Sequence, residues 1–335
     1  MSNKLRCAMP VTLILIFISV YTLVPIHGNA EQKKGLYHDL FSASFPTKNE
    51  GWVCGRWGTI LYTGDGGLTW ARQQSGTNYT LSSISFVDSK NGWAVGDGGT
   101  ILHTKDGGKS WVKQKSPVPY FLMGVHFANS QKGWVVGERT TILCTEDGGQ
   151  TWQIQFKDKD FILKRISFCD ERYGWAVGEF GYIYHTGDGG KIWRRQAGEF
   201  KFSEETGEMV GGNFLFDVVA INPITAWVVG IDGYAARTVD GGASWKKVTN
   251  GLPKTHLFGV AADGQGTILI GGNALLLTSS DADKTFQNAE VEPRITYGWI
   301  YGISPRGREG FVAIGKGGWI YLGNKKGTSW QRVVY

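Results

Sequence analysis

Aspartate recurs at a fixed place within a short motif of this sequence, and such a row of carboxylates could supply catalytic acids or calcium ligands. The motif is Thr-x-Asp-Gly-Gly-x-x-Trp, seen first at residues 63–70 and then four more times. A sixth copy is degenerate, and a seventh, which ends at Trp330, lacks the aspartate. The recurring residues are Asp65, Asp106, Asp147, Asp188, Asp240 and Asp281.

The spacing of the motif favours a structural role for these aspartates. The closing aromatic residue falls at positions 70, 111, 152, 193, 245, 286 and 330, so most intervals are 41 residues. Equivalent positions of successive repeats lie on separate turns, too far apart to form one site. An aspartate can instead accept N–H groups of its own turn, while Gly-Gly supplies the positive φ angles. We therefore predict that each aspartate closes a hairpin and that no metal or cofactor binds there.

The elements around the motif predict an all-β fold. A second motif, Gly-Trp-x-Val-Gly, precedes it in most units, and short alternating apolar runs such as Leu81–Phe86 come before that. Four strands per unit in seven units predict a seven-bladed β-propeller, with four antiparallel strands per blade and the aspartate turns between strands three and four. The predicted blades are 36–76, 77–117, 118–158, 159–199, 211–251, 252–292 and 293–335, with an insertion within 196–215.

The first 30 residues have the pattern of a secretory signal peptide. Lys4 and Arg6 precede the apolar stretch 11–24, and small residues follow it up to Ala30. This order of a basic, an apolar and a small-residue segment is typical of a cleaved signal. An uncleaved anchor is the alternative, although about 20 apolar residues are needed to span a bilayer. We expect an exported chain, periplasmic or extracellular, in which residues 31–335 form a single propeller.

Composition excludes several classes of function. The formal charge is +6 without a cluster of Lys and Arg, so we expect no nucleic-acid partner. Cysteine occurs 4 times without a C-x-x-C pair, and the 6 histidines show no ligand spacing. The sequence therefore predicts neither a zinc nor a redox site.

The two motifs together resemble a known family. The aspartate motif is similar to the Asp box, or bacterial neuraminidase repeat, and its combination with Gly-Trp-x-Val-Gly in seven units resembles the photosystem II stability/assembly factors. The resemblance implies an exported propeller, located in the thylakoid lumen of a photosynthetic host, that binds newly made reaction-centre proteins and has no enzymatic activity. It implies a membrane-protein complex or another exported protein as the partner. It is also compatible with peripheral membrane association and a monomeric state.

Other Asp-box proteins are enzymes, and they define the alternative. Sialidases need three arginines, a Tyr nucleophile and an Asp acid, and their Phe/Tyr-Arg-Ile-Pro motif is absent here. Glycosidases need two carboxylates about 5–10 Å apart, which acidic loop residues could supply. A glycan-active or glycan-binding propeller therefore stays open as the second interpretation.

We expect a partner to bind the loops that join strands two and three, because propeller strands are occupied by packing. The residue that follows each second strand is Arg56, Asp97, Glu138, Glu179, Ile231, Gly272 and Lys316 in blades one to seven. Acids thus follow one another in blades two to four, while bases occupy blades seven and one. Neighbouring candidates for the binding face are Trp57, Tyr120, Phe121, Arg139 and Phe180, with the aromatic residues as apolar anchors.

Two charged residues are predicted to face the central channel. Arg165 and Asp217 occupy equivalent positions on the first strands of blades four and five, where other blades carry Ser or Gly. They could form an ion pair or contribute to a ligand site.

The N-terminal pattern yields a direct prediction. Because the small residues end at Ala30, the protein isolated from its own cells should begin at Glu31. Intact-protein mass spectrometry of the exported fraction measures this. A chain that begins at Met1, or that is found in the cytoplasm, would contradict the prediction.

Overall fold

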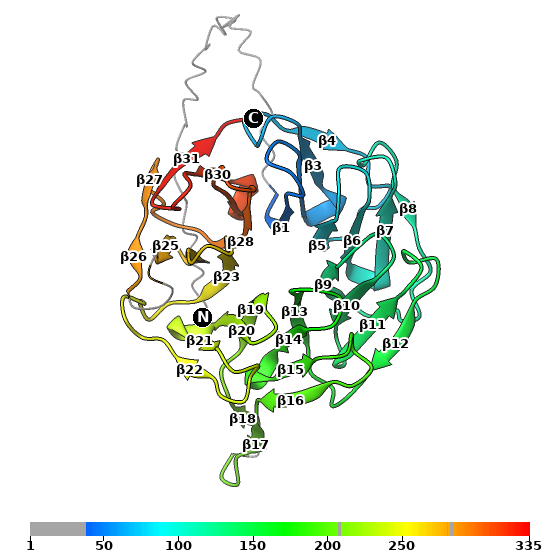
Figure 1. The fold of residues 1–335 in the computed structure, drawn as a ribbon, viewed down its shortest axis with the longest axis vertical. Helices are drawn as coiled ribbons and strands as arrows, with labels where there is room; N and C mark the ends of the chain where they lie inside the picture. Colours follow the sequence, from blue (N-terminus) through cyan, green and yellow to red (C-terminus); the bar gives the residue numbers. More distant parts are fainter. Residues whose placement is uncertain (1–37, 207–208, 280, 282–284) are drawn as a thin grey trace, which may run out of the picture. The chain divides into compact units, whose positions relative to one another are not determined.

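The computed structural model describes residues 38–206, 209–279, 281 and 285–335, and the predicted signal peptide, residues 1–30, lies outside them. The described chain confirms the all-β seven-bladed propeller, with four antiparallel strands in each blade (Figure 1). Each blade uses four consecutive strands, and its first strand is the innermost.

The first four blades follow the repeat closely. Blade one contains β1 (Leu40–Ser44), β2 (Gly51–Gly55), β3 (Ile60–Thr63) and β4 (Ala71–Gln73). Blade two contains β5 (Leu81–Phe86), β6 (Gly92–Gly96), β7 (Thr100–Thr104) and β8 (Val112–Lys113). Blade three contains β9 (Leu122–Phe127), β10 (Gly133–Gly137), β11 (Thr141–Thr145) and β12 (Gln153–Phe156). Blade four contains β13 (Leu163–Phe168), β14 (Gly174–Gly178), β15 (Ile183–Thr186) and β16 (Arg194–Ala197).

The last three blades have the same order of strands. Blade five contains β19 (Leu215–Asn222), β20 (Thr225–Gly230), β21 (Ala235–Thr238) and β22 (Lys246–Lys247). Blade six contains β23 (Leu257–Ala262), β24 (Ile268–Gly272), β25 (Leu275–Ser279) and β26 (Gln287–Asn288). Blade seven contains β28 (Ile300–Pro305), β29 (Phe311–Gly315), β30 (Ile320–Gly323) and β31 (Ser329–Val333). Short 3-10 turns follow five second strands: η1 (Arg56–Gly58), η2 (Asp97–Gly99), η3 (Glu179–Gly181), η4 (Ile231–Gly233) and η5 (Lys316–Gly318).

Two short segments depart from the predicted blades. The insertion forms a separate hairpin of β17 (Phe200–Phe202) and β18 (Met209–Gly211), which projects from the ring in Figure 1. The segment β27 (Glu290–Glu292) falls within the range predicted for blade six, but it pairs in parallel with β31 of blade seven. Blade seven is therefore a five-stranded sheet in which β27 covers the outer edge of β31.

Packing between complete blades closes the ring. The innermost strands contact one another in the order β1, β5, β9, β13, β19, β23 and β28, and β28 contacts β1 again. An apolar cluster joins blades seven and one, formed by Leu40, Val53, Leu61, Val312, Ile314 and Ile320. Arg306 Nη1 of blade seven also donates to the Gly66 carbonyl oxygen of blade one at 2.7 Å.

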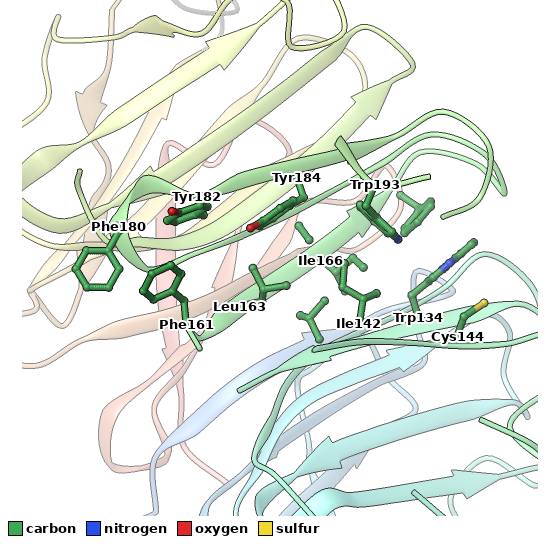
Figure 2. Packing of buried hydrophobic residues seen from close by; sticks show 13 residues of the cluster. Trp134, Ile142, Cys144, Phe161, Leu163, Ile166, Phe180, Tyr182, Tyr184 and Trp193 are labelled. Atoms are coloured by element: carbon green, nitrogen blue, oxygen red, sulfur yellow. The ribbon is translucent and has the colours of Figure 1, made fainter. Parts of the chain in front are cut away.

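Aromatic stacking fills the space between blades. In blades one to three, the tryptophan of the Gly-Trp-x-Val-Gly motif stacks on a phenylalanine of the next blade, as Trp93 does on Phe127 with ring centroids 3.5 Å apart. The edge of Phe127 meets Trp152, the tryptophan of its own Asp box, at 5.8 Å. Figure 2 shows the corresponding cluster between blades three and four, which includes Trp134 and Trp193. Both repeated tryptophans therefore serve the core.

Each complete Asp box is a hydrogen-bonded turn between the third and fourth strands. In blade two, Asp106 Oδ1 accepts the Ser110 N–H at 2.9 Å and the Thr104 hydroxyl at 2.8 Å. Asp106 Oδ2 accepts the Ser110 hydroxyl at 2.6 Å. These bonds stabilise the ionised carboxylate and lower the pKa of Asp106 to about 2.

A second set of bonds joins boxes two to five to the preceding blade. The carbonyl oxygen of Gly148, the first glycine of the third box, accepts Trp93 Nε1 at 3.1 Å and Gln114 Nε2 at 2.9 Å. Gln114 Oε1 in turn accepts Trp152 Nε1 at 3.0 Å. Gln73, Gln155 and Gln196 donate in the same way to the box of the next blade. The glutamine lies three residues after the box tryptophan in blades one to four, a regularity that the sequence analysis missed.

This geometry predicts that Asp106→Ala destabilises the propeller. The variant loses three hydrogen bonds of one turn, so we expect its Tm at pH 7 to fall by about 2–4 °C, as for one lost capping interaction. Lys105→Ala removes an exposed side chain of the same turn and serves as the control. Thermal unfolding by circular dichroism measures both.

The same variant carries a pH signature. Asp106 has a lower pKa in the folded protein, about 2, than its ordinary value of 3.8, so its stabilising effect is fully present above about pH 4 and is lost as the pH falls through 2. The difference in Tm between wild type and Asp106→Ala should therefore shrink from pH 4 to pH 2. A difference that stays constant over this range would contradict the assignment.

Candidate binding face and central pocket

The loops that join second and third strands lie together on one face of the propeller, here called the mouth face. The first residue of each loop donates its N–H to the carbonyl group just before the innermost strand of its blade, as Arg56 does to Asp39 at 3.0 Å. In blade six this residue is Asn273, so the prediction of Gly272 was wrong by one position. Gly272 belongs to β24, where it pairs with Leu257 as Gly55 pairs with Leu40.

The predicted acidic arc is only partly available to a partner. Asp97 is exposed, and its carboxylate accepts only the neighbouring Gly98 N–H, at 2.7 Å. Glu138 Oε2 accepts the Phe121 N–H at 3.1 Å, and Glu179 Oε2 accepts the Ile162 N–H at 3.0 Å. Both glutamates are half-buried and hold the segments that enter their own blades. Their carboxylates therefore have a structural role.

The predicted basic residues lie beside aromatic rings on blades seven and one. Lys316 Nζ lies 3.8 Å from the ring centroid of Tyr297 and 4.9 Å from that of Trp299. Arg56 lies over Phe41 at 5.7 Å, and its Nε is 3.3 Å from Asp39 Oδ2. Three aromatic residues are exposed among those whose burial the structure describes: Tyr297 just before β28, Trp57 in η1 and Tyr79 in the linker between blades one and two.

The residue after each loop start adopts a left-handed conformation. Blades two and seven place Gly98 and Gly317 there, with φ of 62° and 63°. Trp57 takes the same conformation with φ 55°, although its side chain is 61 % exposed and contributes no core packing. Arg139, Phe180, Asp232 and Ala274 also have positive φ in their loops. A bulky residue in this region is strained, and retained strain at a surface position suggests a functional side chain.

Phe180 is buried, so the prediction that it serves as an exposed anchor was wrong. Its side chain is 8 % exposed and packs against Phe161, with ring centroids 4.9 Å apart (Figure 2). Its ring centroid also lies 5.3 Å from that of Phe214. Trp57 has the same φ of 55° but an exposed ring, so the contacts with Phe161 and Phe214, and not the backbone conformation, account for the burial of Phe180. Tyr120 is half-buried under Arg139, whose Nη1 donates to the Tyr120 hydroxyl at 3.1 Å. Phe121 lines the central pocket described next.

A β-bulge in every innermost strand directs one side chain toward the channel at the mouth face. The pairing between the first two strands shifts by one residue in each blade, for example between Leu163 and Arg165 of β13. The extra residues are Phe41, Ser82, Met123, Lys164, Phe216, Phe258 and Tyr301. All seven line one pocket of about 390 Å³, here called the central pocket. Bulges are known to re-aim side chains at the rims of barrels and near active sites.

Arg165 forms the floor of the central pocket and connects most of the blades. Its Nη1 donates to the carbonyl oxygens of Ser82 and Met123 at 3.1 and 2.9 Å, and its Nη2 donates to that of Phe41 at 3.0 Å. Its Nε lies 3.8 Å from Asp217 Oδ1. The two residues predicted to face the channel thus lie side by side there, and the guanidinium is occupied by protein atoms.

Asp217 replaces a serine of the channel wall. Ser42 Oγ accepts the Ile84 N–H of the next blade at 3.2 Å, and Asp217 Oδ2 accepts the Val260 N–H at 2.9 Å in the same way. Burial raises the pKa of Asp217 to about 6, against the opposing effects of Arg165 and of two N–H donors. The Arg165–Asp217 pair therefore ties blades four, five and six together across the channel.

The sequence analysis missed the bulged residues. Strict strand alternation would direct Lys164 and Arg165 to opposite faces of the strand, but the bulge lets both line the pocket. A signal did exist, because Phe41, Ser82, Met123 and Lys164 recur every 41 residues. In the described part of the chain we find no cluster of His, Cys, Asp or Glu arranged to hold a metal ion. Nor does any described helix have the length and apolar character to cross a bilayer.

Solved structures with the same fold include two from one family. A structure titled "YCF48 bound to D1 peptide" is 20 % identical, with a TM-score of 0.69 over 90 % of this chain and 93 % of the other. YCF48 from Cyanidioschyzon merolae is 19 % identical, with a TM-score of 0.69 over 85 % and 95 %. The GH74 enzyme of Niastella koreensis is 14 % identical, with a TM-score of 0.69 over 89 % of this chain but only 54 % of its own.

Sequence comparison identifies the family. A search of curated protein sequences found no match. A family model described as photosynthesis system II assembly factor YCF48 matches residues 32–119, 113–207 and 202–335, which together reach from residue 32 to the last residue. The family suggested by the Asp boxes is thereby confirmed, and the chain belongs to the photosystem II assembly factor YCF48 family.

Proposed function

We propose that this protein is an exported, non-enzymatic assembly or scaffold factor that binds an exposed segment of a membrane protein across its mouth face. Family membership supports an assembly role, and the related structure titled "YCF48 bound to D1 peptide" supports a peptide segment as the ligand. Export to the periplasm, to the cell exterior or, in a photosynthetic host, to the thylakoid lumen is part of this proposal. It rests on the N-terminal pattern of residues 1–30.

The observation that carries the proposal is the exposed aromatic sector of the mouth face. Trp57, Tyr79 and Tyr297 are exposed on adjacent blades, and two bases, Arg56 and Lys316, lie beside them. Exposed aromatic residues next to charge are typical anchors of protein interfaces. Trp57 in particular keeps a strained backbone without contributing to the core.

A glycan-active propeller is the weaker alternative. The similarity to the GH74 enzyme is at 14 % identity and establishes the fold alone. Glycoside hydrolysis needs a pair of carboxylates, whereas the residues that line the central pocket, all of them described, include no Asp or Glu. The hydrolase interpretation therefore lacks support in the central pocket.

Site-specific cross-linking in intact cells tests the proposal. A photo-reactive amino acid at position 57 should capture a membrane protein, identified by mass spectrometry. The same group at the exposed Lys90, beside the second Asp box on the other face, serves as the control. Cross-links to a membrane protein that form at position 90 and not at position 57 would show that the wrong face was chosen.

Trp57→Gly should separate binding from stability. Glycine relieves the left-handed strain, so we expect an unchanged or higher Tm. Loss of an anchor residue should weaken capture of the partner by about tenfold or more. Leu68→Ala is a matched control, because Leu68 is exposed to the same degree in a box turn where blade five carries Ala243. Unchanged capture by Trp57→Gly would remove Trp57 from the binding surface.

A further inference from the structure

We propose that the central pocket receives one apolar side chain of the bound segment together with an adjacent carboxylate, which Lys164 binds. This inference rests on the proposed function and specifies the chemistry of the segment. Three features of the pocket support it. They are the aromatic wall, the unpaired ammonium group of Lys164, and the fact that the neighbouring arginines already bind groups of the protein itself.

Four aromatic rings from consecutive blades form the apolar wall. Phe216 and Phe258 have ring centroids 5.1 Å apart, Phe258 and Tyr301 are 5.6 Å apart, and Tyr301 and Phe41 are 5.2 Å apart. All four rings are half-buried and none belongs to an interblade core cluster. Met123 continues the lining on blade three. A pocket of about 390 Å³ is small for a ligand site, so it suits one or two residues of a peptide.

Lys164 is the charged group of the wall that lacks a partner. It lies on blade four, beside the aromatic wall, and no described residue forms an ion pair or a hydrogen bond with its ammonium group. Burial lowers the pKa of Lys164, although Glu179 and Glu138 act in the opposite direction. A partly desolvated ammonium group without a partner favours an incoming anion.

The neighbouring charges restrict that anion to a single carboxylate. Arg56 is paired with Asp39, and Arg165 is occupied by three carbonyl oxygens and Asp217. Lys164 is therefore the positive charge of the described pocket that an incoming anion can pair with. Glu138 and Glu179 are close enough to disfavour a second negative charge on that anion. A phosphate group would need more unpaired donors than the described pocket provides.

Methionine methyl resonances give a direct test on the full protein. The chain has four methionines, of which Met123 lines the pocket and Met209 lies in β18 of the hairpin. The probe is N-acetylphenylalanine, which combines a ring with a carboxylate, and N-acetylphenylalanine amide is the neutral control. In protein labelled with ¹³C-methyl methionine, the acid should shift the Met123 resonance in a saturable way. The Met209 resonance should not shift. The acid should bind about tenfold more tightly than the amide, which corresponds to one charge-assisted hydrogen bond.

Two pocket variants and one control identify the groups involved. Lys164→Gln should abolish the preference for the acid, and Phe258→Ser, which copies Ser82 of blade two, should weaken both probes. Lys113→Gln changes an exposed lysine of β8 and should behave as wild type. An unmoved Met123 resonance, or equal affinity for acid and amide in the wild type, would overturn the inference.

Cross-linking separates this inference from the proposed function. If wild-type protein with the photo-reactive group at position 57 captures no membrane protein, the proposed function fails. If it captures one, and Lys164→Gln and Phe258→Ser capture it equally well while both keep the wild-type Tm, the function stands and the pocket inference fails. Reduced capture by both variants supports the pocket as the place where the segment docks.

Discussion

The hydrogen bonds that blades one to four donate to the Asp box of the next blade fix the spacing between these blades. The carbonyl oxygen of Gly148 can accept both Trp93 and Gln114 only when the box turn is closed by its aspartate and when the two blades have the correct separation. The indole that donates this bond also stacks on Phe127 of the next blade. The repeated tryptophan of blades one to three thus couples the polar turn to the apolar core, which links the spacing of blades one to four.

A related constraint applies in the central channel, where backbone groups of the innermost strands need hydrogen-bond partners. The innermost strands of neighbouring blades belong to separate sheets and form no backbone ladder with one another. Side chains must therefore provide hydrogen-bond partners for some of their backbone groups. Ser42, Ser83 and Asp217 do this by accepting an N–H from the following blade. Arg165 satisfies bulge carbonyls from the other direction. The floor of the central pocket is therefore part of the framework, whereas the bulged side chains above it are free to vary between blades.

The fold followed from the sequence because the motifs repeat at nearly constant intervals and each has a local physical meaning. Periodicity also identified the mouth face and the adjacency of Arg165 and Asp217. It could not show which way a loop residue turns. Phe180 and Trp57 occupy the same loop position, yet one ring is buried and the other is exposed, because the packing of neighbouring blades decides. The bulges shift the register by one residue, so Lys164 enters the pocket against the expectation of alternation.

The β17–β18 hairpin between blades four and five indicates how a propeller can acquire new surfaces. The glutamine and its acceptor glycine are separated by 34 residues for Gln73, Gln114 and Gln155, but by 45 residues for Gln196, and the bond is kept. The additional residues lie after the glutamine and before the next innermost strand, so they extend outward without disturbing either blade. Interblade linkers are therefore natural points of growth, where evolution or protein engineering can add a recognition element of a different length while the framework keeps its register.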